Sequence, residues 1–280
     1  AIRQEEKRMR RNRREGTASR ITRFFPMLMA ALLFFLALSL AGADEDAVLK
    51  KGGTTGDTSA KADGYVRICQ EAGSKRYKLR ITHGEDVYTY DLNNQGAWEI
   101  FPLQLGVGEY RVQVYRQQSG KQYSAITSLN FTVDAFTREN ACFLVPNQYV
   151  NYTMDSDVVQ LAKQTCQSLS DDKAKADALA DVVLRNIQYD YIGAMSMPKG
   201  YLPDVDAVLK KGMGICLDYA AVYASMLRSQ GIAAQLVIGY ADKSYHAWNL
   251  VWLDGAWTCV DLTAQSTAQK YMTYTTERFY

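Results

Sequence analysis

A cysteine, a histidine and an aspartate in the last third of the chain are the residue types that nucleophilic amide chemistry needs. Cys216 follows Gly212-Met213-Gly214-Ile215, and the next residues, LDYAAVYASMLRSQ, are mostly helix formers without proline or glycine. This pattern predicts that Cys216 begins a helix. The free backbone N–H groups and the positive dipole end at such a position favour the thiolate, the nucleophilic form of cysteine.

The segment HAWNLVWLDGAWTCVDLT holds Asp254-Gly255 between two runs of strand formers, a strong signal for a two-residue hairpin turn. Counting outward from that turn predicts three cross-strand pairs: Trp252 with Trp257, Leu250 with Cys259, and Trp248 with Asp261. His246 then lies diagonally across from Asp261 on one face of the hairpin. An imidazole and a carboxylate placed in this way can meet.

These three residues fit the roles of a catalytic triad. A thiolate attacks a carbonyl, an imidazole moves the proton, and a carboxylate orients the imidazole. We assign Cys216 as nucleophile, His246 as base and Asp261 as its orienting partner. Each residue alone has a structural interpretation, since an isolated cysteine is often a small buried hydrophobe. The coincidence of a helix-start cysteine with an aligned histidine and aspartate favours catalysis.

Five residues near the predicted triad are candidates for lining its cleft: Gly214, Asp218, Tyr219, Tyr245 and Trp248. A glycine before the cysteine would let a substrate chain approach closely. Packing is an equally good interpretation for Tyr219 and Trp248. The Cys216 backbone N–H is one expected oxyanion donor, and the second donor is a side chain that the sequence does not identify.

The segments GMGICLDYAAVYASMLRSQGIAAQLVIGY and SYHAWNLVWLDGAWTCVDLT resemble the transglutaminase-like superfamily. Its members place the cysteine in a G-x-C-x-[DE]-[YF]-A helix start, the histidine in an H-A-W strand and the aspartate in a V-D-x-T strand. The resemblance covers residues 187–265, with Leu262 where many relatives have proline. It implies an α+β, papain-like fold with the cysteine helix packed on an antiparallel sheet, and no cofactor.

The resemblance specifies the reaction mechanism better than it specifies the substrate. Members of the superfamily include protein cross-linking acyltransferases, peptidases, other amide hydrolases and inactive proteins. Fold and triad therefore predict a thioacyl intermediate formed from a protein or peptide, cell-wall peptides included. Both acyl transfer and hydrolysis stay open. The alternative is a non-catalytic cell-envelope module that binds a peptide in the same cleft.

The chain before the triad divides by its periodicity. Residues 64–135 contain alternating runs, YVRICQ, RYKLRIT, DVYTYDL, EYRVQVYRQ and SAITSLNFTVD, which predict a small antiparallel β-sandwich. Residues 146–280 shift toward helical spacing and form the predicted transglutaminase-like domain. Residues 44–63 are small and polar, with glycines at their centre, and are predicted to be a flexible linker.

Residues 1–43 are typical of an export leader. They hold nine basic and three acidic residues, and the stretch 24–43 is uncharged and mostly apolar. The stretch ends in Ala41-Gly42-Ala43, small residues that suit a signal peptidase. A signal peptide cleaved after Ala43 is one interpretation, and a membrane anchor formed by 24–43 is the other. Either places the body outside the cytoplasm, secreted or attached to the outer face of a bacterial cell membrane.

Composition argues against other function classes. Beyond residue 43 the chain has 23 basic and 27 acidic residues, which leaves no positive surplus for a nucleic-acid backbone. The whole chain has two histidines and lacks zinc-ligand spacing, an EF-hand loop and a phosphate-binding glycine loop. We therefore expect no metal. Five scattered cysteines are too few for a disulfide scaffold in a chain of this length.

Overall fold

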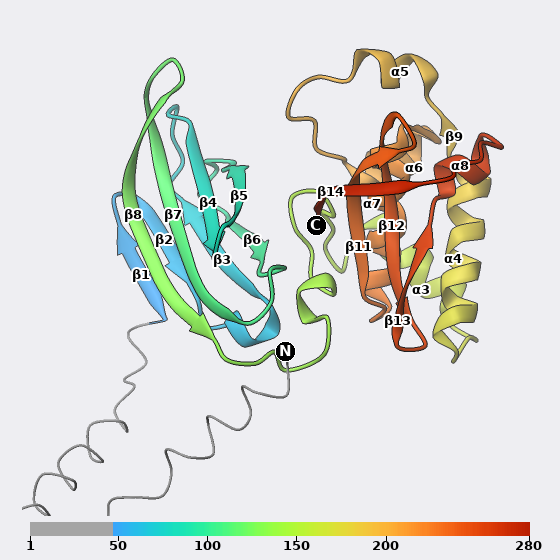
Figure 1. Cartoon of the computed structure of the whole chain (residues 1–280), viewed down its shortest axis with the longest axis horizontal. Helices are drawn as coiled ribbons and strands as arrows, with labels where there is room; N and C mark the ends of the chain where they lie inside the picture. Colours follow the sequence, from blue (N-terminus) through green and yellow to red (C-terminus); the bar gives the residue numbers. More distant parts are fainter. Residues whose placement is uncertain (1–46) are drawn as a thin grey trace, which may run out of the picture. The chain divides into compact units, whose positions relative to one another are not determined.

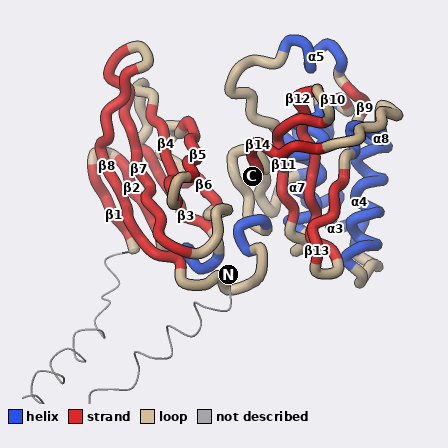
Figure 2. The backbone as a smooth tube through the Cα atoms, in the orientation of Figure 1, coloured by secondary structure: helices blue, strands red, loops and turns tan. Residues whose placement is uncertain are grey.

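The computed structural model describes residues 47–280 (Figure 1). The predicted leader, 1–43, lies outside the described residues. Within 47–280 no helix is long and apolar enough to cross a membrane. Strands and one short 3-10 helix make up the first part of the described chain, and α-helices combine with strands in the second part (Figure 2). The fold of the second part is the predicted α+β class.

The first part consists of two four-stranded antiparallel sheets. One has the order β1-β2-β3-β6, from β1 Val48–Lys51, β2 Thr54–Asp57, β3 Tyr65–Gln70 and β6 Trp98–Pro102. The other has the order β5-β4-β7-β8, from β5 Asp86–Asp91, β4 Tyr77–His83, β7 Gly108–Ser119 and β8 Gln122–Val133. The five predicted strand runs correspond to β3, β4, β5, β7 and β8, whereas β1, β2 and β6 were not predicted.

Alternation along the strands builds the core between these sheets. Val66 and Ile68 are buried in β3, and Leu79 and Ile81 are buried in β4. The residues between them face the other side of each sheet, because side chains alternate along a strand. All four belong to one hydrophobic cluster, so each sheet contributes one buried face to a common core.

Residues 48–63 are not the flexible linker that the sequence predicted for 44–63. β1 and β2 form an antiparallel hairpin in which Lys51 pairs with Thr54, and β2 continues the sheet by pairing with β3. The glycines between them, Gly52 and Gly53, have φ angles of 62° and 77°. Two consecutive left-handed residues define a tight hairpin turn that favours glycine. The sheets therefore begin at Val48 rather than at Gly64.

The second part combines helices with a four-stranded antiparallel sheet of order β13-β12-β11-β14. Its helices are α3 Asp157–Cys166, α4 Asp172–Asn186, α5 Tyr191–Ser196, α6 Val205–Lys211, α7 Cys216–Ser229 and α8 Leu262–Ser266. Its strands are β11 Ala234–Ala241, β12 Ser244–Leu253, β13 Ala256–Val260 and β14 Tyr274–Phe279, with a parallel pair β9 Gln188–Tyr189 and β10 Met213–Gly214. Short 3-10 helices span Lys61–Asp63 (η1) and Ala141–Phe143 (η2).

Helix α7 is the centre of the second part. It contacts β11 and β12 on one side and α3, α4 and α6 on others. Every residue from Leu217 to Arg228 is buried. Ala220, Ala221 and Ala224 keep the helix narrow, which lets sheet and helices approach it closely. A helix that is enclosed on all sides holds its first residue in a fixed place.

Arg228 anchors the C-terminal end of α7 through hydrogen bonds. Its buried guanidinium donates hydrogen bonds to the backbone carbonyls of Val145, Ala234 and Tyr280 at 2.6 to 2.9 Å. Burial lowers the pKa of Arg228 to about 10, so the side chain remains charged at neutral pH. A buried charge needs such compensating acceptors. The contacts hold α7 to the connecting segment, to β11 and to the last residue of the chain.

Candidate active site

Cys216 is the first residue of α7, as the sequence predicts. Ile215 before it is extended, with φ −92° and ψ 178°, and its N–H donates to Asp218 Oδ2 at 2.8 Å. The first N–H groups of a helix have no acceptor within the helix, so they are available to stabilise negative charge near Cys216. Cys216 is partly exposed while the residues behind it are buried. The sulfur is thus accessible at the start of an otherwise enclosed helix.

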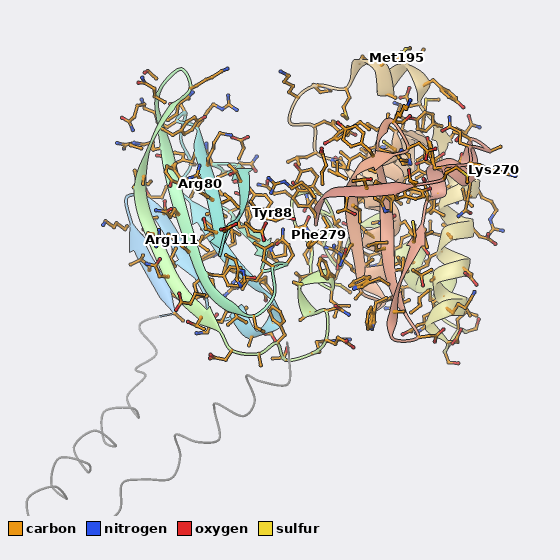
Figure 3. All side chains as sticks on the ribbon, viewed as in Figure 1. Arg80, Tyr88, Arg111, Met195, Lys270 and Phe279 are labelled. Carbon is orange, nitrogen blue, oxygen red and sulfur yellow. The ribbon has the colours of Figure 1, made fainter. Side chains whose placement is uncertain are left out.

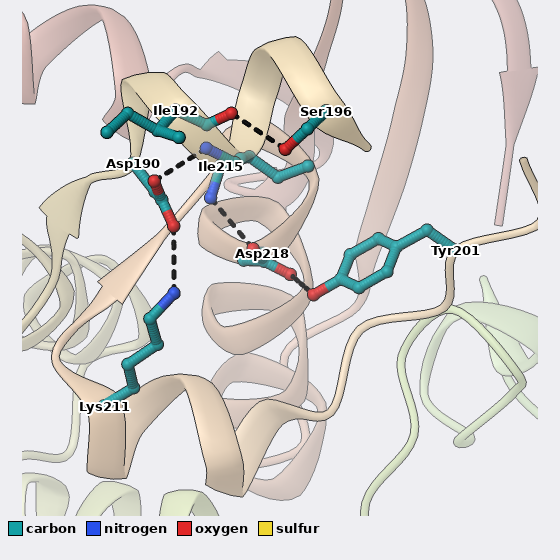
Figure 4. Close-up of polar contacts among 8 residues, drawn as sticks. Asp190, Ile192, Ser196, Tyr201, Lys211, Ile215 and Asp218 are labelled. Atoms are coloured by element: carbon teal, nitrogen blue, oxygen red, sulfur yellow. Dashed lines mark hydrogen bonds and ion pairs between the residues drawn. The ribbon is translucent and has the colours of Figure 1, made fainter. Parts of the chain in front are cut away.

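Polar contacts hold the segment before α7 against its first turn (Figure 4). The Tyr201 hydroxyl donates to Asp218 Oδ1 at 2.7 Å, and Lys211 pairs with Asp190 at 2.9 Å. Burial raises the pKa of Asp218, although hydrogen bonds from Ile215 and Tyr201 oppose the rise. The Asp218 carboxyl therefore has a structural role: it accepts hydrogen bonds from the Ile215 N–H and the Tyr201 hydroxyl at the start of α7.

His246 and Asp261 meet as the hairpin register predicts. Leu253 pairs with Ala256, and the pairing of β12 with β13 continues without a register shift to the pair of Asn249 and Val260. Asp254 and Gly255 have φ angles of 53° and 77°, as a two-residue type I′ turn requires. His246 Nε2 lies 2.8 Å from Asp261 Oδ2, and both side chains are 5% exposed.

The Asp261 carboxylate accepts hydrogen bonds from three groups. His246 and the Tyr274 hydroxyl both bond Oδ2, the latter at 3.0 Å, and the Ala264 N–H bonds Oδ1 at 2.9 Å. The resemblance implied that Asp261 lies in a strand, but Asp261 is the N-cap of α8. The turn into α8 explains this, because an N-cap aspartate satisfies a free N–H of the helix. Three donors hold the carboxylate in one orientation toward His246.

The surroundings of His246 favour its protonated form. Burial lowers the pKa of His246, but hydrogen bonds to Asp261 and Cys216 and their negative charges outweigh burial and raise the pKa to about 9. His246 is therefore an imidazolium at neutral pH. Because Nε2 bonds Asp261, the other ring nitrogen is available to Cys216. A thiol and a carboxylate beside one imidazole are the partners that a thiol nucleophile needs.

A cleft of about 520 Å³ opens beside His246. Four tyrosines line it, Tyr189, Tyr191, Tyr245 and Tyr271, together with Met195 of α5. Burial is the largest cause that raises the pKa values of Tyr189, Tyr245 and Tyr271. The next cause is the charge of Cys216 for Tyr189, of Glu277 for Tyr245 and of Asp261 for Tyr271. Other lining residues are small or uncharged, such as Ser244, Thr263 and Gln269.

Of the five predicted cleft residues, only Tyr245 lines this cleft. Asp218 instead lines a neighbouring cavity of about 290 Å³ beneath α5. Tyr219 is buried and donates to the Ile187 carbonyl at 2.6 Å, and Trp248 is buried beside His246 and Tyr274. Tyr219 and Trp248 thus have the packing role that the sequence left open as an alternative, because side chains alternate between faces along a strand and rotate around a helix.

Gly214 also has a different role from the predicted one. It is buried in β10, and a Cβ added there would lie 2.7 Å from the Cβ of Asp218. Such a contact is closer than packed atoms allow, so a side chain would push Asp218 out of its place. Gly214 therefore leaves room for the Asp218 side chain at the start of α7, and not for an approaching substrate.

Four site tyrosines were not predicted: Tyr189, Tyr191, Tyr271 and Tyr274. Tyr189 precedes α5, Tyr191 begins α5, Tyr271 lies between α8 and β14, and Tyr274 begins β14. Tyr271 packs against the His246 ring at 5.2 Å, and Tyr274 packs against Tyr271 at 6.0 Å. The segment YMTYTT has neither a motif nor a clear period, and only the pairing of β14 with β11 returns it to the site.

The other four cysteines have different surroundings. Cys142 and Cys166 are buried, and burial raises the pKa of Cys142 to about 12. Cys259 is exposed on β13, and none of the five cysteines is in a disulfide. No group of three His, Cys, Asp or Glu side chains in residues 47–280 is arranged to hold a metal ion.

Comparison with known proteins identifies a family for this region. Residues 159–262 match the model of the transglutaminase-like superfamily. Kyphoscoliosis peptidase of Homo sapiens is 27% identical over 123 residues, which are 40% of this chain and 18% of the human protein. The matched region thus spans less than a fifth of that relative.

Two solved structures show partial similarity. The periplasmic domain of TgpA from Pseudomonas aeruginosa aligns with a TM-score of 0.37 and 17% identity over 79% of this chain and 96% of that domain. A structure described as a TGase aligns with a TM-score of 0.36 and 22% identity over 57% of this chain and 47% of its own.

Proposed function

Because residues 159–262 form a transglutaminase-like domain, we propose that the chain is an exported thiol enzyme that acts on amide bonds of protein or peptide substrates. The observation that carries the proposal is the buried 2.8 Å bond between His246 and Asp261, with the Cys216 thiol beside the same imidazole. A merely structural histidine has no need of both a carboxylate and a thiol.

The proposed reaction has two halves. In the first, the Cys216 thiolate attacks the amide carbonyl carbon, and the imidazolium of His246 gives its proton to the leaving amine as the C–N bond breaks. A thioester on Cys216 and a neutral His246 result. In the second, His246 takes a proton from an amine or a water that attacks the thioester. The new amide or acid leaves, and the thiolate and imidazolium are restored.

The helix start and the carboxylate support the charged states of this cycle. Negative charge develops on the carbonyl oxygen during both halves, and the Cys216 N–H is the backbone donor we assign to it. Asp261 accepts the hydrogen bond of His246 and keeps the His246 ring turned toward the sulfur. Its three hydrogen-bond donors resist rotation of the carboxylate while the proton moves.

Export is part of the proposal and rests on residues 1–43, with their arginine-rich start and apolar stretch. A cleaved signal peptide would release the enzyme, and an anchor would hold it at the outer face of the membrane. Expression of the full chain in a bacterial host, followed by cell fractionation and mass determination of the N-terminus, tests both. Retention of uncleaved chain in the cytoplasm would contradict export.

Mass spectrometry of envelope proteins tests the activity itself. Wild type and Cys216→Ala are each incubated with these proteins in the presence of a labelled primary amine. We expect amine incorporation or new termini with the wild type, and neither with Cys216→Ala. Incorporation at glutamine means acyl transfer, and new termini mean hydrolysis. If neither occurs with the wild type, the proposal fails in favour of a non-catalytic peptide-binding module or of a non-protein substrate.

A further inference from the structure

Helix α5 exposes apolar side chains beside the candidate active site. None of its residues is buried, and Tyr191, Ile192 and Met195 are 61%, 76% and 83% exposed. Figure 3 shows Met195 at the edge of this helix. Large apolar side chains grouped in this way mark a binding surface more often than a solvated one. Packing in the core therefore does not explain why α5 carries these large apolar side chains.

Polar contacts at both ends hold this exposed segment in place (Figure 4). At its start, Asp190 accepts from the Gly193 N–H at 2.8 Å and pairs with Lys211 of α6. After its end, the Tyr201 hydroxyl bonds Asp218 in the first turn of α7. The segment is thus joined before α5 to the end of α6 and after α5 to the first turn of α7, the helix that Cys216 begins.

The opposite side of the cleft is also aromatic. Tyr245 immediately precedes His246 in β12 and is 58% exposed, and Tyr271 packs against the His246 ring. Tyr191 and Met195 of α5 line the same cleft. Whatever occupies the space between these side chains is in contact with His246, the proposed general acid and base. An occupant of this cleft therefore lies where a substrate would lie.

The cleft offers no partner to a charged group. No Asp, Glu, Lys or Arg is among its lining residues, and His246 is already bonded to Asp261. A carboxylate or an ammonium group that entered would lose water without gaining an opposite charge. Aromatic and aliphatic side chains would gain from burial against four tyrosines and a methionine.

We propose that this cleft selects polypeptide segments in which the residues next to the reacting amide are uncharged and aromatic or aliphatic. The inference rests on the proposed function. Stem peptides of bacterial cell walls carry free carboxylates and amines close to their amide bonds, so the cleft disfavours them. Among the substrates predicted from sequence, a protein segment fits and a cell-wall peptide does not.

Trapping with hydroxylamine tests this selectivity without knowledge of the natural acceptor. Hydroxylamine attacks a thioester to give a hydroxamate and the free thiol, whether the enzyme is a hydrolase or a transferase. The full-length protein is incubated with a peptic digest of a denatured proteome or with soluble cell-wall muropeptides. Mass spectrometry then locates each hydroxamate, with Cys216→Ala as the blank.

We expect hydroxamates in the proteome digest, with aromatic or aliphatic residues at the flanking positions enriched about tenfold over charged ones. Equal use of charged flanks, or preferential modification of muropeptides, would overturn this inference and leave the proposed function intact. Absence of hydroxamate from both sources would overturn the proposed function, and the inference with it.

A charge placed on α5 supplies a second test. Met195→Glu puts a carboxylate at the cleft and should shift the preference toward lysine-flanked peptides by about tenfold, because it provides the missing opposite charge. Met154→Glu is the matched control, since Met154 is 65% exposed and lines neither cavity. If Met195→Glu and Met154→Glu select the same peptides as the wild type, α5 does not contact the substrate and the proposal fails.

Discussion

The two histidines of the chain lie in regions that use the same side chain differently. His83 ends β4 in the first sheets, is partly buried, and bonds the Val107 carbonyl at 3.0 Å beside the ring of Tyr110. His246 is buried in β12 between Asp261 and Cys216. A carbonyl only anchors an imidazole, whereas a carboxylate and a thiol can change its charge. The partners, and not the residue type, distinguish the two.

The cysteines support the same comparison. Cys142 in η2 is buried, and burial raises its pKa to about 12, so it remains a thiol at neutral pH. Cys216 begins α7, is accessible and has an imidazolium beside it. His83 and Cys142 are thus internal controls for His246 and Cys216, respectively.

The largest expected effect follows removal of the nucleophile. Cys216→Ala should reduce thioacyl formation to background, a loss on the order of 10⁶ in turnover, because no other group at the site can form the thioester. Cys142→Ala should retain activity once folding is verified by circular dichroism. Hydroxamate yield per enzyme is the measurement. Activity of Cys216→Ala above background would show that another residue is the nucleophile.

Neutralising the carboxylate comes next. Asp261→Asn should keep the hairpin folded but let His246 adopt the wrong tautomer, at a cost of up to ~10⁴ in turnover. Asp254→Asn is the matched change at the turn and should be nearly silent, since Asn-Gly supports the same type I′ turn. The assignment of Asp261 would fail if Asp254→Asn proved inactive and Asp261→Asn fully active.

The raised pKa of His246 predicts a pH-dependent stability. Its folded value of about 9 exceeds the unfolded value of about 6.5, so the stabilisation is fully present below pH 6.5 and is lost as the pH rises through 9. The shift corresponds to roughly 3 kcal/mol. Urea unfolding of wild type and His246→Gln between pH 6 and 10 should show the two free energies of unfolding converging. Parallel curves would contradict a protonated His246.

The same protonation predicts an alkaline limit on activity. The reaction needs the imidazolium to protonate the leaving amine, so kcat/KM for thioacyl formation should fall above about pH 9. Stopped-time trapping with hydroxylamine from pH 7 to 10.5 measures the profile, with a correction for the free hydroxylamine fraction. A decline centred near pH 6.5 would show that the carboxylate and thiol do not act on His246.

The smallest effect concerns Tyr274, which holds Asp261. Tyr274→Phe removes one hydrogen bond to Oδ2, worth about 1 kcal/mol, and should lower turnover roughly fivefold. It should also move the alkaline limit upward, because a carboxylate with fewer donors attracts the imidazolium more strongly. Tyr115→Phe, which removes a hydroxyl bonded to Gln113 in the sheets, is the control. An unchanged profile in Tyr274→Phe would make its contact incidental.

Local signals predicted the parts of the site that depend on one turn or one helix start. Cys216 was found because a glycine-rich approach ends where helix formers begin, and the Asp254-Gly255 turn sets the register that brings His246 to Asp261. The five predicted strands follow the same rule, since alternation is local. The transglutaminase-like fold was predicted from three motifs within residues 187–265.

Features that depend on distant partners were missed. Tyr274 reaches Asp261 only because β14 pairs with β11, a contact between segments with no shared motif. Gly52-Gly53 was interpreted as flexible, although a glycine pair also suits a tight hairpin, and only β3 gives that hairpin a sheet to join. For Trp248 the sequence left the cleft and packing as equal alternatives, and the structure shows its ring buried against His246.

Alkylation of the cysteines by iodoacetamide tests the central claim most directly, because it needs no substrate. Peptide mapping by mass spectrometry follows the rate at each cysteine at pH 7. We predict that Cys216 reacts faster than Cys259, which is exposed on β13, and that this advantage disappears in His246→Ala. If Cys216 reacts no faster than Cys259 in the wild type, or if His246→Ala leaves its rate unchanged, the thiolate and imidazolium are not a functional pair.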